Sequence, residues 1–125
     1  MGYKVLIADD SAVMRKIILR ALQQVDIPVE RIFEVGDGQE ALSAVDSEKV
    51  DLILSDINMP NMDGLEFIKK MHEKGLSTTI PIIMITTEGS EAKVMECIQH
   101  GAKGYIKKPF SAEQLQEKVK AVLSI

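Results

Sequence analysis

The chain has 125 residues, a hydrophobic share of 46% and a formal net charge of −4 at pH 7. This length predicts a single domain, residues 1–125, with one core. The acidic balance gives no reason to expect nucleic-acid binding. Because no apolar run is long enough to span a membrane and no secretory pattern opens the chain, we expect a cytoplasmic protein without membrane attachment. The single cysteine, Cys97, excludes an internal disulfide and is expected to be a packing residue.

The first apolar run, Tyr3 to Ala8, predicts a buried strand that ends at Asp9 and Asp10. Ser11 or Asp10 is expected to cap the helix that follows. Apolar residues at helical spacing form the predicted inner face of this helix, namely Met14, Ile17, Ile18, Ala21, Leu22 and Val25.

A more polar strand, residues 31–35, is predicted at a sheet edge. Asp37 with Glu40 resembles a capping box for a short helix that follows the turn at residues 36–38. The next strand, Leu52 to Leu54, is apolar without alternation, which is typical of a strand covered on both faces. It ends at Asp56, and Pro60 then turns the chain.

The second half of the chain repeats this alternation. A helix is predicted from Asp63-Gly64 to Gly75, a strand over residues 80–85 that ends at Thr86, and a helix over about residues 90–100. A short strand, residues 105–107, ends at Lys108, and Ser111 with Gln114 forms a capping box for the last helix. The inward residues expected on these three helices are Leu65, Ile68, Met71, Val94, Ile98, Leu115, Val119, Val122 and Leu123.

Strands that alternate with helices through short connections predict an α/β fold with a parallel sheet covered on both faces. In such a sheet the carboxyl ends of the strands meet at one edge, where ligands bind. The residues that follow the strands are Asp9, Asp10, Asp56, Thr86 and Lys108. Each has a local explanation, as a cap, a strand residue or a solvated lysine, but their joint placement favours a site.

Carboxylates held close together repel one another, and a hard divalent cation such as Mg²⁺ relieves that repulsion. The two histidines, His72 and His100, fall in helices away from this edge, which argues against zinc. A carboxylate beside Mg²⁺ can attack phosphorus and form an aspartyl phosphate. A lysine and a threonine hydroxyl would then neutralise and hydrogen-bond the phosphoryl oxygens.

These motifs, together with Met59-Pro60 and Lys108-Pro109-Phe110, resemble the receiver domain of two-component response regulators. The resemblance spans the whole chain, in order, and is nearest to the stand-alone chemotaxis regulators of the CheY type. It implies a flavodoxin-like fold, a doubly wound five-stranded parallel sheet of order 2-1-3-4-5 with five helices.

The resemblance also implies a role for each site residue. Asp56 corresponds to the phosphoacceptor, Asp10 to a direct Mg²⁺ ligand, and Asp9 to a residue that acts mainly through water. The backbone carbonyl of Asn58 corresponds to a further Mg²⁺ ligand. Lys108 corresponds to the residue that contacts the phosphoryl group, and its bond to Pro109 is expected to be cis.

Further positions correspond to the family's switch and output. Thr86 and Tyr105 match the pair that rearranges on phosphorylation, and the residues that tune the phosphoryl lifetime are Asn58, Thr87 and Glu88. Because these are small or acidic, a short-lived phosphoryl state is expected. The fourth helix, fifth strand and last helix form the implied partner face, which contains Val94, Tyr105 and Lys118.

The implied partners are a sensor histidine kinase, the flagellar motor switch protein or another downstream protein, and a possible phosphatase. A monomer is expected, with self-catalysed phosphotransfer and autodephosphorylation but no enzymatic turnover of another substrate. A phosphorelay intermediate that passes its phosphate to a histidine phosphotransfer protein remains the alternative.

Three other readings fit the residues less well. An aspartate-nucleophile phosphatase has a second aspartate where Asn58 stands, and a flavin-binding flavodoxin would have its phosphate repelled by Asp9 and Asp10. An unphosphorylated, degenerate receiver would lack a site residue, and none is missing.

Overall fold

The computed structural model describes residues 2–24, 27–87 and 90–125. Strands and helices alternate along these residues, and all the paired strands are parallel, in the order β2-β1-β3-β4-β5. This arrangement confirms the predicted fold class. The elements are β1 (Tyr3–Ala8), α1 (Ala12–Gln23), β2 (Val29–Val35), α2 (Gly38–Ser47), β3 (Leu52–Ser55), α3 (Gly64–Glu73), β4 (Ile82–Thr86), α4 (Glu91–Gln99), β5 (Gly104–Lys107) and α5 (Ala112–Leu123).

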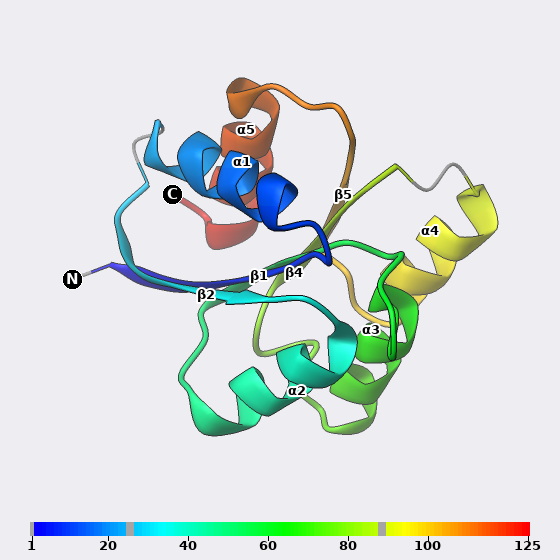
Figure 1. Ribbon diagram of the computed structural model, residues 1–125. Coiled ribbons are helices and arrows are strands. Elements are labelled where there is room, and N and C mark those ends of the chain that lie inside the picture. The colour runs from blue at the N-terminus through cyan, green and yellow to red at the C-terminus, as the bar shows by residue number, and fades with distance from the viewer. Residues whose placement is uncertain (1, 25–26, 88–89) are drawn as a thin grey trace.

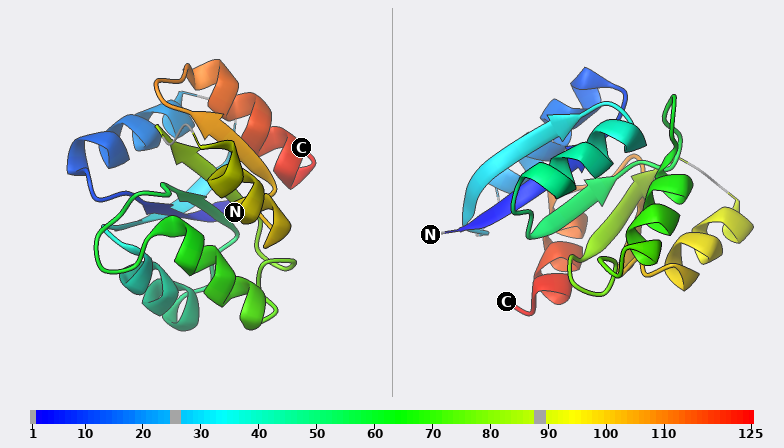
Figure 2. Two further views of the ribbon diagram at one scale, coloured as in Figure 1. Left: turned by 90° about the vertical axis from the view of Figure 1, so that its right-hand side faces the viewer. Right: turned by 90° about the horizontal axis from the view of Figure 1, so that it is seen from below.

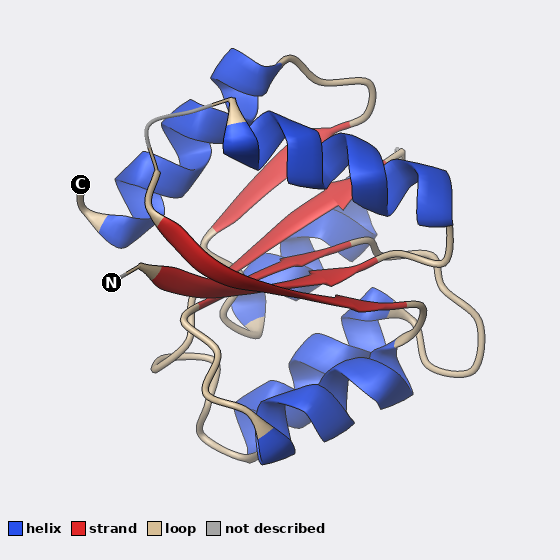
Figure 3. Ribbon diagram, turned by 60° about the vertical axis from the view of Figure 1, so that its left-hand side comes forward, coloured by secondary structure: helices blue, strands red, loops and turns tan. Residues whose placement is uncertain are grey.

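Helices cover both faces of the sheet (Figure 1). The pair α1 and α5 lies on one face, and α2, α3 and α4 lie on the other, which Figure 3 shows from a second direction. The strand arrowheads in Figure 2 point to the same edge of the sheet. The carboxyl ends of the strands therefore meet there, as the sequence predicted.

Alternate residues of each inner strand supply two separate cores. In β3, Leu52 and Leu54 pack with α1 and α5, whereas Ile53 packs with the helices of the opposite face. Because both faces are covered, these strands are apolar throughout, which explains the lack of alternation in the sequence. The edge strand β2 is only half-buried, as expected for an edge.

Each of the five helices begins at a residue whose side chain accepts a hydrogen bond from the backbone of the first turn. Ser11, and not Asp10, caps α1. Ser111 and Gln114 form the predicted capping box of α5. The capping box predicted for α2 is only half correct, because the Glu40 carboxylate accepts from the N–H of Gly36 and not from that of the N-cap, Asp37.

Two helical residues predicted to face the core are exposed instead. Ile17 is 44% exposed and Ile98 is 43% exposed. Successive helical residues are rotated by about 100°. Because Ile18 and Cys97 point into the core, their neighbours Ile17 and Ile98 lie at the margin of the helix–sheet contact. Phe67, which the sequence analysis did not place inward, is fully buried on α3.

Smaller differences concern element ends. The strand predicted from residue 80 begins at Ile82, because Ile80 donates its N–H back to the carbonyl of Leu76 within a turn. The second strand begins two residues earlier than predicted, at Val29. Val25, predicted on the inner face of α1, lies outside the described residues. Within the described ranges, every helix is too short or too polar to cross a bilayer.

Candidate functional site

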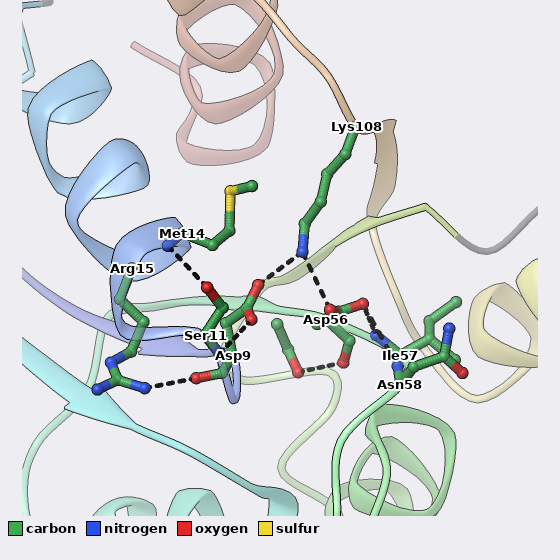
Figure 4. Close-up of polar contacts among 9 residues, drawn as sticks. Asp9, Ser11, Met14, Arg15, Asp56, Ile57, Asn58 and Lys108 are labelled. Atoms are coloured by element: carbon green, nitrogen blue, oxygen red, sulfur yellow. Dashed lines mark hydrogen bonds and ion pairs between the residues drawn. The ribbon is translucent and has the colours of Figure 1, made fainter.

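The residues predicted from the strand ends come together at the carboxyl edge of the sheet (Figure 4). Asp9 follows β1, Asp56 follows β3, and Lys108 follows β5. The ammonium of Lys108 lies between the two carboxylates, 2.6 Å from Oδ2 of Asp9 and 3.0 Å from Oδ2 of Asp56. The peptide bond between Lys108 and Pro109 is cis, as predicted.

These charged side chains are almost fully buried. The side chains of Lys108, Asp9 and Asp56 are 8%, 2% and 10% exposed. Burial by itself lowers the pKa of Lys108, but the hydrogen bonds that its ammonium donates to Asp9 and Asp56 more than offset this, so its pKa lies above the ordinary lysine value. The lysine is therefore cationic at neutral pH and balances part of the negative charge around it.

The backbone fixes the carboxylate of Asp56. Its Oδ1 accepts hydrogen bonds from the N–H groups of Ile57, at 2.7 Å, and Asn58, at 3.3 Å. The main-chain carbonyl of Asp56 packs against Gly64, where any Cβ would overlap it. Gly64 also donates its N–H to the carbonyl of Ile57 at 2.7 Å. The glycine of the Asp63-Gly64 motif is thus required by the close approach of the β3–α3 loop.

Asp9 and Asp10 complete a cluster of three carboxylates. Oδ1 of Asp9 accepts from the N–H of Ser11 at 2.9 Å, whereas Asp10 is exposed. One carboxylate oxygen from each of Asp9, Asp10 and Asp56 lies within 4.8 Å of the others. This donor set, made only of hard oxygen ligands with an open solvent side, fits Mg²⁺. The carbonyl of Asn58 remains a predicted ligand.

Of the two predicted switch residues, Thr86 contacts a residue of the site. Thr86, the last residue of β4, is fully buried, and its carbonyl accepts the N–H of Lys108 at 2.9 Å. Thr87 is exposed, which leaves that side of the site open to water. Tyr105 of β5 is half-buried, paired with Met84 in the sheet and packed against the core that α2, α3 and α4 cover. Glu88 lies outside the described residues.

The predicted partner-face residues come from α4, β5 and α5. Tyr105 and Lys118 line a groove of about 440 Å³ between β5 and α5, together with Gln114. Val94 is half-buried and packs from α4 onto the core. Tyr105 packs against the same core as Val94 and shares the groove with Lys118, and whether the three residues bind a partner stays a prediction.

The remaining reactive residues lie outside the carboxylate cluster. The rings of His72 and His100 contact each other edge to face, with centroids 5.6 Å apart, and neither belongs to the cluster. Burial raises the pKa of the Cys97 thiol to about 11. Cys97 is therefore a protonated packing residue at neutral pH, as the sequence predicted.

The sequence did not predict two hydrogen bonds that lie outside the carboxylate cluster and fix the segments around it. Arg15 donates from Nη1 to the main-chain carbonyl of Asp9 at 2.7 Å. The side-chain amide of Asn61 donates to Oδ2 of Asp37 at 2.7 Å, which ties the β3–α3 loop to the start of α2. Helical periodicity placed Arg15 only as a residue off the apolar face, so no sequence signal identified its target. Asn61 has a positive φ of 64°, which its turn-forming residue type allows.

The comparisons with known proteins agree with this geometry. The model of the response regulator receiver domain family matches residues 5–120. The chain is 40% identical over 121 residues to the chemotaxis protein CheY1 of Helicobacter pylori, with 96% of each chain covered. It is 39% identical to the CheY homolog of Campylobacter jejuni, covering 96% of this chain and 92% of that protein.

A solved structure gives the same result in three dimensions. The chemotaxis protein CheY4 of Vibrio cholerae superposes with a TM-score of 0.81 at 37% identity, covering 98% of this chain and 99% of that one. The fold, the acidic cluster beside a buried lysine, and these similarities lead to one conclusion. The chain belongs to the response regulator receiver domain family, the signalling switches of two-component systems.

Proposed function

We propose that Asp56 accepts a phosphoryl group from a sensor histidine kinase and that this modification switches the protein between signalling states. One observation carries the proposal. The Asp56 carboxylate is held by two backbone N–H groups on one oxygen and by Lys108 on the other, inside a cluster of three carboxylates. An acid placed in this way is oriented for attack and surrounded by groups that can accommodate a divalent cation.

In the proposed reaction an oxygen of Asp56 attacks the phosphorus of a phosphohistidine. The new O–P bond forms as the N–P bond breaks, and its electron pair returns to the histidine nitrogen, which takes up a proton. Lys108 and the Thr86 hydroxyl then hydrogen-bond the phosphoryl oxygens. Bound Mg²⁺, held by Asp9, Asp10, Asp56 and the Asn58 carbonyl, would supply charge neutralisation on the transferring group.

Water reverses the modification by attacking the phosphorus of the acyl phosphate and releasing inorganic phosphate and the free carboxylate. The exposed side of the site at Thr87 supports the expectation of a short-lived phosphoryl state. The protein turns over no other substrate in this scheme, so it acts as a switch and not as an enzyme of metabolism. We place it in the cytoplasm, as a monomer.

The phosphorylation step is tested with acetyl phosphate and Mg²⁺, followed by intact mass. We expect the wild-type chain to gain the mass of one phosphoryl group only when Mg²⁺ is present, and Asp56→Asn to gain none. Equal modification of both proteins would show that a different residue accepts the group.

The downstream role we favour is chemotaxis, in which the phosphorylated form binds the flagellar motor switch protein. The support is that relatives at 39–40% identity over nearly the whole chain carry chemotaxis names. A flagellar switch peptide should capture the beryllofluoride-treated wild type and not Asp56→Asn. Rapid transfer of phosphate to a histidine phosphotransfer protein, without peptide binding, would instead favour the phosphorelay alternative.

A further inference from the structure

We propose that Arg15 is a positioning residue that aims the carboxylate of Asp10 at the metal site by holding the peptide bond between Asp9 and Asp10. The inference rests on the proposed function, because it concerns the Mg²⁺ ligands of that site. It adds a residue that lies outside the cluster and carries the opposite charge to a metal ligand.

The guanidinium of Arg15 connects three segments of the fold, and Figure 4 shows its contact with Asp9. From α1, its Nη1 donates to the main-chain carbonyl of Asp9 at 2.7 Å, and its Nε donates to Oε1 of Glu34 on β2 at 3.1 Å. The side chain is only 20% exposed. Glu34 is held in turn by Lys16, whose ammonium lies 2.6 Å from Oε2. The planar guanidinium is therefore fixed at two of its nitrogens.

Asp10 needs this support more than the other two carboxylates do. Asp9 is held by Lys108 and by the N–H of Ser11, and Asp56 is held by Lys108 and by two backbone N–H groups. The exposed Asp10 side chain has no hydrogen bond or ion pair among the described residues. Its direction therefore depends on its own backbone.

The backbone of Asp10 is set by the peptide unit that joins it to Asp9. That unit is planar, so fixing its carbonyl oxygen also fixes the nitrogen and Cα of Asp10. Arg15 fixes the oxygen, and the preceding N–H of Asp9 donates to the carbonyl of Val35 at 3.1 Å. Losing Arg15 would leave this peptide held only through the flanking N–H groups of Asp9 and Ser11, and would spread Asp10 over a wider range of orientations.

A positioning role and simple electrostatics predict opposite changes in Mg²⁺ affinity when Arg15 is removed. Removing a cation near a divalent cation site strengthens Mg²⁺ binding by relieving repulsion. Removing a group that orients a ligand weakens it, by about tenfold at the lower end for outer partners of metal ligands. Lys16 is the matched control, because it is also cationic, adjacent on α1 and bonded to Glu34, but has no contact with Asp9 in the described structure.

The test is a Mg²⁺ titration of the full chain followed by amide chemical shifts in NMR spectra, which also report whether each variant is folded. We expect Arg15→Met to raise the dissociation constant about tenfold, and Lys16→Met to leave it unchanged or lower it. Arg15→Lys keeps the charge but cannot hold two acceptors with a planar fork, so it should also weaken binding. Unchanged or tighter Mg²⁺ binding by Arg15→Met, or wild-type affinity of Arg15→Lys, would overturn the proposal.

Phosphorylation separates this inference from the proposed function. At the Mg²⁺ concentration that half-saturates the wild type, we expect acetyl phosphate to modify Lys16→Met at least as completely as the wild type and Arg15→Met less completely, because only Arg15 holds the Asp9 carbonyl. If wild-type amides near the cluster do not respond to Mg²⁺, the proposed metal site and the Arg15 inference both fail. If the wild type responds and Arg15→Met responds identically, only the Arg15 inference fails.

Discussion

The carboxylate site and the outer surface of α4 reverse the usual distribution of charged and apolar side chains. At the site, the side chains of Asp9, Asp56 and Lys108 are between 2% and 10% exposed. On α4, Met95 and Ile98 are 52% and 43% exposed, and Cys97 is the helix's one buried residue. Charge is thus buried where the chemistry is proposed, and apolar surface is open where a partner is implied.

This contrast shows that the two regions relate to fold stability in different ways. Buried charges cost free energy unless every partner is in place, so the site is stable only as a complete set. The exposed side chains of α4 bury little surface and contribute little to the core. Substitutions at the site should therefore alter both stability and chemistry, whereas substitutions on the outer surface of α4 should alter neither.

The largest effect is expected for Lys108→Met. Removing the lysine leaves Asp9 and Asp56 buried without their common cation, which should lower the free energy of unfolding by about 4 kcal/mol. Urea unfolding at neutral pH measures this loss. Added Mg²⁺ should restore more stability to the variant than to the wild type, because the metal replaces the missing charge. If Lys108→Met were as stable as the wild type without Mg²⁺, the buried carboxylates would not need the lysine, and the site would not depend on a complete set of charges.

The difference in unfolding free energy between the wild type and Lys108→Met should depend on pH. The folded-state pKa of Lys108 is raised, so its contribution is fully present below the ordinary value of about 10.5 and is lost as the pH rises through the folded-state pKa. The stability gap between wild type and Lys108→Met should therefore be constant near neutrality and narrow above about pH 10.5. A gap that widens with rising pH would mean that another group dominates.

The next effect concerns the backbone behind Asp56. An added Cβ at Gly64 would overlap the Asp56 carbonyl and lie 2.9 Å from Cα of Ile57. Gly64→Ala should therefore cost about 3 kcal/mol of unfolding free energy and slow phosphorylation in the fraction that folds. Gly75→Ala is the matched control, because only its φ of 73° opposes the change and nothing lies within 4 Å, which should cost about 1 kcal/mol. Equal losses would show that the close approach is unimportant.

A smaller effect is expected for Asp37→Asn. The Asp37 carboxylate accepts from Asn61 and from the N–H of Glu40, and these hydrogen bonds, led by that of Asn61, lower its pKa. The variant would place two amide donors face to face and should lose about 1 kcal/mol at pH 7 in urea unfolding. Because the pKa is lowered, the wild-type advantage is present above about 3.8 and fades as the pH falls through the folded-state value. A constant gap down to pH 2 would contradict this assignment.

The smallest effect is expected on α4. Replacing Met95 and Ile98 together by serine should change the unfolding free energy by no more than about 0.5 kcal/mol, as for other exposed positions. Phosphorylation from acetyl phosphate should also be unchanged. A loss of several kcal/mol would show that this surface supports the fold, and the contrast between the two regions would then be wrong.

The sequence predicted the parallel sheet and the principal residues of the site for one physical reason. Strand–helix alternation predicts parallel strands, whose carboxyl ends meet at one edge, so Asp9, Asp56 and Lys108 were expected there; the strand order itself came from the resemblance to the receiver family. Continuous apolar strands such as Leu52 to Leu54 gave an unambiguous signal because both of their faces are covered.

The sequence could not predict features that depend on the position of a helix over the sheet. Ile17 and Ile98 have the right spacing, but a few tens of degrees of helix rotation decides whether a marginal residue is covered. Arg15 donates to the backbone carbonyl of Asp9. Because every residue has such a carbonyl, the residue types do not show which one accepts the hydrogen bond. For the same reason the sequence could not show that the carboxylate of Glu40 accepts from the backbone N–H of Gly36.

Phosphorylation of Asp56 can be tested by identifying the modified side chain itself. The wild-type protein is incubated with acetyl phosphate and Mg²⁺, reduced with borohydride, and digested for peptide sequencing by mass spectrometry. Reduction converts an aspartyl phosphate into homoserine. We expect homoserine at position 56 and intact aspartate at positions 9 and 10. Homoserine at Asp9 or Asp10, or at no position under conditions where the protein gains phosphate, would contradict this expectation.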